Sequence, residues 1–139
     1  MKRVIVSETT IDELRELAES PSDSRRRQVA YHYLTPSDVL EMLADDYDDS
    51  VRSGVGRNSN TPAHVLEKLA NDSSPNVVSS VALNRNASPE ILDMLSHHES
   101  KYVRMNVAVN RNTSQETLDR LAKDKNRDVR FAAKNRRFP

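Results

Sequence analysis

Hydrophobic positions recur along this chain with a constant period. Leucine pairs return every 26 residues without an insertion, at Leu14/Leu17, Leu40/Leu43, Leu66/Leu69, Leu92/Leu95 and Leu118/Leu121. Two further columns keep the same spacing: Val51, Val77, Val103 and Val129, and Val29, Val55, Val81 and Val107, the second continuing as Ala133. A period of this length is the sequence signature of a repeat architecture. The pattern therefore predicts five tandem units.

Each unit predicts two short helices. The first is expected to begin at a hydroxyl cap followed by proline (Thr35-Pro36, Thr61-Pro62, Ser88-Pro89) or at a capping box (Thr10 with Glu13, Thr113 with Glu116). The second carries Val51, Gly54, Val55 and Asn58 on one face. Helices this short are unstable alone, so neighbouring units must stack.

The predicted fold class is all-α, a right-handed α-solenoid of about five tandem 26-residue two-helix repeats. We expect a single repeat domain over residues 1–139, with units at about 8–34, 35–60, 61–86, 87–112 and 113–139.

Two columns of the second helix predict how units meet. The column of Gly54, Ser80, Asn106 and Ala132 is small or polar, as expected where helix backbones approach closely. Asn58, Asn84 and Asn110 form a second column, with His32 and Arg136 in the end units. The favoured interpretation is a ladder of side chains bonding backbone groups. Contact with a ligand is the alternative.

These columns carry a family resemblance. The segments Val51-Arg52, Val55-Gly56-Arg57-Asn58, Thr61-Pro62, Leu66 and Leu69-Ala70-Asn71-Asp72 resemble the leucine-rich repeat variant family and, more distantly, HEAT-like repeats, over residues 8–135. The spacing here is slightly longer than that family's, which suggests two full helices per unit. The resemblance implies a scaffold without shared chemistry. The cysteine-bound cluster of one member cannot transfer, since this chain has no cysteine.

Composition excludes several classes of function. Without cysteine there are no disulfides, thiolate zinc sites or iron–sulfur clusters, and two glycines in all exclude long glycine-rich phosphate loops. Aromatics make up 4% of residues and tryptophan is absent, which favours a thin, extended core. The apolar run of residues 1–7 is too short for a signal peptide, and no segment has the ~18 apolar residues of a membrane span. We expect a soluble cytoplasmic protein.

No catalytic or metal-binding constellation is evident. His97 and His98 are adjacent and point in different directions, while His32 and His64 belong to other units. No histidine or carboxylate lies three or four residues from His97 or His98 to complete a metal-binding helix face. No Ser/His/Asp arrangement can be argued either. We therefore expect a protein that is not an enzyme, with no catalytic residue, metal or cofactor.

The charge is unevenly distributed although its sum is zero. Residues 1–50 carry a net −6, residues 51–100 a net −1 and residues 101–139 a net +7. This dipole suggests head-to-tail self-association of copies, and the basic last unit suggests weak contact with nucleic-acid phosphates.

Two arginine columns have a structural and a functional interpretation. Arg26, Arg52, Arg104 and Arg130, interrupted by Val78, are expected to pair with Asp46, Asp72 and Asp124; binding of phosphate or carboxylate is the alternative. Arg85, Arg111 and Arg137, with Arg57 nearby, follow the second helices. They are either solvated surface or a row that follows a polyanion.

The candidate binding surface lies opposite the core stripe of the second helix, on the columns that start at Ser53, Gly56 and Arg57. Leu83, Met105, Val109 and Phe131 would form an apolar strip there. The alternative is lateral packing between adjacent helices, which would bury the Leu83/Val109 column. The leading hypothesis is a scaffold that binds a protein helix or extended segment through this strip, oriented by Arg57, Arg85 and Arg111. The alternative is phosphate-backbone binding by the basic last unit. Phe131 and Phe138 suggest that its end is covered by its own tail or by another chain.

Overall fold

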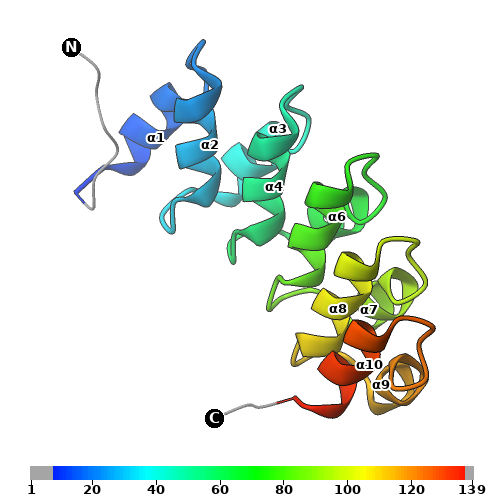
Figure 1. The fold of residues 1–139 in the computed structure, drawn as a ribbon. Coiled ribbons are helices and arrows are strands. Elements are labelled where there is room, and N and C mark those ends of the chain that lie inside the picture. Colours follow the sequence, from blue (N-terminus) through cyan, green and yellow to red (C-terminus); the bar gives the residue numbers. More distant parts are fainter. Residues whose placement is uncertain (1–7, 137–139) are drawn as a thin grey trace.

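The computed structural model describes residues 8–136, which form a curved stack of paired helices (Figure 1). The first helices of the units are α1 (Ile11–Leu17), α3 (Ser37–Leu43), α5 (Ala63–Leu69), α7 (Pro89–Leu95) and α9 (Gln115–Leu121). The second helices are α2 (Asp23–Tyr31), α4 (Asp49–Arg57), α6 (Pro75–Ala82), α8 (Lys101–Val109) and α10 (Arg127–Lys134). The predicted all-α repeat stack is confirmed, and its right-handedness stays a prediction.

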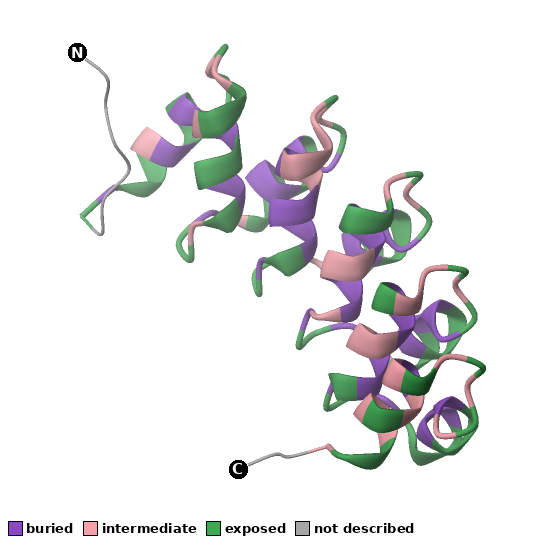
Figure 2. Cartoon of the chain, in the orientation of Figure 1, coloured by how far each residue is buried: buried purple, intermediate pink, exposed green. Residues whose placement is uncertain are grey.

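The core is a thin layer between the two rows of helices. The first leucines of four pairs and the valines of both columns are fully buried, at Leu14, Leu40, Leu66, Leu92, Val29, Val51, Val55, Val77, Val81, Val103, Val107 and Val129. Figure 2 shows these buried segments facing the neighbouring helices, with exposed residues on the outer surfaces. Helices of seven to nine residues persist because each unit buries its apolar stripe against its neighbours.

The predicted helix caps are partly right. The Ser88 hydroxyl accepts a hydrogen bond from the backbone N–H of Ile91 at 3.1 Å, and Thr10 accepts one from Glu13 at 3.3 Å. The prediction for Thr35, Thr61 and Thr113 is wrong. Pro36 and Pro62 occupy the N-cap positions of α3 and α5, and Ser114 caps α9.

The three threonines instead close the helix that precedes them. Thr35 Oγ1 donates to the carbonyl of Val29 at 2.6 Å, and Thr113 Oγ1 donates to that of Val107 at 2.6 Å. Thr61 makes the same bond to the carbonyl of Val55. All three side chains are buried. The hydroxyl is thus used at the end of the second helix, where carbonyls lack partners inside the helix.

The asparagine ladder is confirmed. Asn84 Nδ2 donates to the carbonyls of Gly56 at 2.8 Å and of Asn58 at 3.0 Å, both in the preceding unit. Asn58 and Asn110 repeat this arrangement, and Arg136 Nη2 continues it with a 2.7 Å bond to the carbonyl of Asn110. A second row was not predicted: the side-chain amides of Asn60, Asn86 and Asn112 donate to backbone carbonyls in the corresponding turn of the preceding unit.

Small residues let the second helices approach one another. A Cβ atom added to Gly54 would lie 2.7 Å from Ala30 Cβ, and one added to Gly56 would lie 3.1 Å from Ser80 Cβ. Ala82 and Ala108, which take the place of Gly56 in later units, are fully buried. The expectation that this column faces outward is therefore wrong, because it packs against the following unit. The second helices lie along the inner side of the curve in Figure 1.

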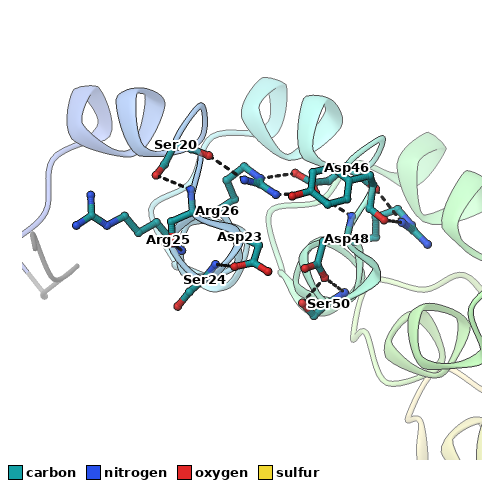
Figure 3. A network of polar contacts seen from close by, with 11 residues as sticks. Ser20, Asp23, Ser24, Arg25, Arg26, Asp46, Asp48 and Ser50 are labelled. Atoms are coloured by element: carbon teal, nitrogen blue, oxygen red, sulfur yellow. Dashed lines mark hydrogen bonds and ion pairs between the residues drawn. The ribbon is translucent and has the colours of Figure 1, made fainter.

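A row of ion pairs with side chains at most 16% exposed joins the loops at one edge of the stack. Arg26 Nε donates to Asp46 Oδ2 at 2.8 Å while its Nη1 donates to the carbonyl of Ser20 at 2.8 Å (Figure 3). Arg52 pairs with Asp72, and Arg104 with Asp124, in the same way. The structural interpretation of this arginine column is confirmed for these three pairs.

Replacing Asn84 by alanine should destabilise the fold more than replacing Asn86. Asn84 is buried, and its loss leaves two buried carbonyls without their side-chain donor, at a cost of about 2–3 kcal/mol. The exposed Asn86 should cost less than about 1 kcal/mol. Urea unfolding of both variants measures the difference. Equal losses would contradict the ladder as the stabilising element.

Replacing Gly54 by alanine should destabilise the protein although alanine favours helices. The gain in helix propensity is about 1 kcal/mol, but the new methyl group collides with Ala30 and with the Tyr31 ring, for which we expect about 1–3 kcal/mol. Gly56→Ala, with its wider contact, is the matched control and should retain more stability in thermal unfolding. A Gly54→Ala protein more stable than wild type would show that the backbones do not approach this closely.

Candidate partner-binding groove

Three adjoining hollows follow the face of the second helices. The first has a volume of about 420 Å³ and lies over α2, α4 and α6; the second, of about 320 Å³, shares Tyr31, Arg57 and Leu83 with it. The third, of about 270 Å³, shares Leu83 and Arg85 with the second and extends to Val109 and Arg111. Because the hollows share walls, they form one groove across four units.

The repeat explains why these side chains lie together. Tyr31, Arg57 and Val109 are the last residues of α2, α4 and α8, and Leu83 directly follows α6. These positions are 26 residues apart, so each stacked unit adds one side chain to the same line. Tyr33, Ser59, Arg85 and Arg111 form the adjacent line, two residues further along each unit. Stacking thus converts two sequence columns into two walls of a groove.

The predicted site residues are only partly brought together. Arg57, Leu83, Arg85, Val109 and Arg111 line the hollows. Val109 is 46% exposed and Leu83 is half-buried. Packing between helices therefore leaves this column accessible.

Two predicted anchors lie apart from the groove. Met105 is half-buried and packs against the core. Phe131 on α10 is 68% exposed and lines none of the three hollows. Arg137 and Phe138, also considered in the sequence analysis, lie outside the described residues.

Several residues of the first two units also line the groove and were not predicted from the sequence. Tyr31 and Tyr33 are both largely exposed and line the second hollow, while Arg27 and Ser53 line the first. The repeat spacing would have identified Tyr31, because it lies 26 residues before Arg57, in the column of Leu83 and Val109. The apolar strip was sought in units three to five only, where the aliphatic residues are.

The arginines divide into two groups by their partners. Arg26, Arg52 and Arg104 each hold an aspartate of the next unit and a loop carbonyl, so they are occupied within the fold. The guanidinium groups of Arg27, Arg57 and Arg85 form no hydrogen bond or ion pair with any residue between 8 and 136. These three are exposed and lie on the groove. They are available to a partner.

Several ionisable groups of the stack have pKa values set by neighbours in adjacent units. The hydrogen bond to Asp46 raises the pKa of Arg26, so this guanidinium is always charged. Arg120 and the Thr117 hydroxyl lower the pKa of Asp93. Burial alone would raise the pKa of Asp124, but hydrogen bonds from Arg104 and the backbone of Asn126 outweigh it, and the net shift is downward. Burial lowers the pKa of Arg136.

The outer face differs from the groove because its charges pair across units. Arg15 lies 2.5 Å from Asp38, His64 lies 3.0 Å from Glu41, and Lys68 contacts Asp45. Each pair joins neighbouring first helices or the turns that follow them. Exposed pairs of this kind contribute little energy. They do, however, leave this face without a row of unpaired arginines.

Within residues 8–136 no three histidine, aspartate or glutamate side chains gather in a way that could hold a metal ion. In the same range, no helix combines the length and the apolar character needed to cross a membrane.

The paired helices define an all-α repeat fold, which is consistent with a scaffold. Among solved structures the chain is similar to one described as a leucine-rich repeat variant with a novel repetitive structural motif, at 27% sequence identity and a TM-score of 0.71. The match covers 92% of this chain and 52% of that one, so the present chain spans about half its length. The resemblance inferred from the repeat columns is thereby confirmed. No family model and no curated protein matches the chain.

Low pH should reduce the free energy of unfolding by protonating Asp124, the partner of Arg104. Asp124 has a lowered pKa in the folded protein, so its stabilisation is fully present above its unfolded pKa of about 3.9 and is lost as the pH falls through the folded value. Urea unfolding at pH 7 and pH 3 should show this loss, and Asp124→Asn should show a smaller one. The same pH dependence in both proteins would mean that the pair does not contribute.

Proposed function

We propose that this protein is a repeat scaffold that binds a protein partner along the face of its second helices. The observation that carries the proposal is the continuity of the three hollows, which share lining residues from Tyr31 to Arg111. A continuous groove suits a partner segment that runs along the stack. The similarity to another repeat structure supports a scaffold and gives no information about the partner.

The groove has the composition of a recognition surface. Tyrosine and arginine, which are enriched where interfaces carry their energy, line it beside leucine and valine, which add apolar contact area. Leu83 belongs to all three hollows and is the central candidate anchor. Val109 and Tyr31 flank it on either side along the stack. Arg57, Arg85 and Arg111 would orient the partner.

Nucleic-acid binding by the basic last unit is less favoured by the observed contacts. Arg120 pairs with Asp93 at 2.8 Å, and Arg130 donates to the carbonyl of Asp124 at 2.7 Å. These two arginines are therefore engaged in contacts within the fold, which leaves fewer cations of the last unit free for phosphates.

Replacing Val109 by arginine should abolish partner capture without unfolding the protein. Val109 is 46% exposed, so the larger side chain fits at the surface while it obstructs the groove. Met42→Arg on α3 is the matched control, because Met42 is also 46% exposed and lines none of the hollows. Wild type and both variants would be used to capture proteins from an extract of the cells that express this chain.

We expect partners that wild type and Met42→Arg retain and Val109→Arg loses, by at least tenfold in quantitative mass spectrometry. Thermal unfolding checks that both variants fold. Partners lost equally from both variants, or from neither, would exclude the groove as the binding face. Capture that disappears on nuclease treatment would favour the nucleic-acid alternative.

A further inference from the structure

We infer that the partner segment is acidic: it is an extended peptide that places a carboxylate between Arg27, Arg57 and Ser53 and apolar side chains on Leu83 and Val109. This inference rests on the proposed function and adds the chemistry of the partner. It follows from the charge of the groove, from an unsatisfied polar group in its wall, and from the order of polar and apolar positions along it.

The groove is a basic surface in a protein whose net charge is zero. Four arginines line the three hollows (Arg27, Arg57, Arg85 and Arg111), against one carboxylate, that of Asp49. Asp49 is engaged within the fold, since it accepts a hydrogen bond from the Ser74 hydroxyl at 2.8 Å. Three of the arginines have guanidinium groups without a partner among the described residues. Complementarity therefore selects a negatively charged segment.

The wall of the first hollow contains a buried hydroxyl without a partner. Ser53 on α4 is 8% exposed and lines this hollow, and its Oγ forms no hydrogen bond to any residue between 8 and 136. A buried polar group without a partner costs about 1–3 kcal/mol. Such a donor beside Arg27 and Arg57 suits a carboxylate, which accepts several hydrogen bonds at once.

The apolar part of the groove distinguishes a peptide from a polynucleotide. Beyond Arg57 the line of side chains continues with Leu83 and Val109, which have no polar atoms to offer a sugar–phosphate backbone. A peptide meets both requirements, because it can alternate carboxylates with leucine or phenylalanine. The arginine fork binds a carboxylate or a phosphate equally well, so the apolar surface is what favours the peptide.

The repeat predicts the spacing of the partner's acidic residues. Packed helices lie about 8–10 Å apart, and an extended chain advances about 3.3 Å per residue. One repeat therefore corresponds to about three partner residues. Arg57 and Arg85 belong to successive units and lie two residues from equivalent positions, so we expect acidic residues about three positions apart to meet both.

A library of phage-displayed random peptides of about twelve residues tests this inference on the full chain. Peptides selected by the wild-type protein should be enriched in Asp and Glu at about three-residue spacing, together with Leu, Ile or Phe. Affinity for the selected peptides should fall at least tenfold in Arg57→Glu and in Arg85→Glu. It should fall severalfold in Ser53→Ala, which keeps the volume of the site and removes the donor.

Lys123→Glu is the matched control for the charge reversals. Lys123 is exposed in the turn between α9 and α10 and lines none of the hollows, so peptide affinity should be unchanged in this variant. An equal loss in Lys123→Glu and Arg57→Glu would mean that overall charge, and not the groove, attracts the peptides. That result would overturn the inference.

Two results separate failure of the inference from failure of the proposed function. If the selected peptides are neutral or basic but lose affinity in Val109→Arg, the groove binds a partner and the acidic assignment is wrong. If the library yields no binder, the extended acidic segment is excluded. If, in addition, a single-stranded oligonucleotide binds wild type and Val109→Arg equally, the proposed function is also wrong.

Discussion

The structure depends on the satisfaction of the carbonyl groups at the ends of the second helices. A helix of eight or nine residues leaves its last carbonyls without partners, and here these groups are buried between units. The side chain of Asn58 bonds the carbonyls of Ala30 and His32 in the preceding unit, and the Thr35 hydroxyl bonds that of Val29 at the end of the preceding helix. A unit therefore completes the hydrogen bonding of the one before it. An insertion would displace the asparagine from its acceptors, which explains the constant period.

The ion pairs at the loop edge also join one unit to the next, because each arginine takes its aspartate from the following unit. The third unit is the exception. Val78 occupies the position of Arg26, Arg52 and Arg104, and His98 occupies that of the aspartate partner. Both members of the pair are replaced together, because a buried guanidinium without its carboxylate would be costly. His98 still accepts the backbone N–H of Ser100 at 3.0 Å through Nδ1, the bond that Asp46 makes with Asp48 at 3.0 Å. The loop keeps its shape without the charge.

The fold could be predicted from the sequence because its core positions recur from unit to unit at one spacing. The helix pairs, the asparagine ladder and three Arg–Asp pairs followed from column spacing alone. The role of Thr35 and its equivalents did not, because a hydroxyl before proline has the same local sequence whether it caps the next helix or closes the last one. The outward assignment of Gly56 failed for a related reason: a helical wheel shows which side a residue is on, but not where the next unit packs.

The two ends of the stack differ, and this affects how copies could join. Ladder donors point from a later unit to an earlier one, and loop arginines reach from an earlier unit to a later aspartate. The first unit has His32 and Ser20 in the positions that elsewhere carry the asparagine and the aspartate. A last unit docked against it would find neither partner. Head-to-tail association would therefore rest on the charge gradient alone, whereas the groove combines charge with an unsatisfied donor and apolar surface.

Residues that complete the stack repeat from unit to unit, while those of the groove change from tyrosine to arginine, leucine and valine along one line. Because stacking does not require any of these side chains, their sequence is available to specify a partner.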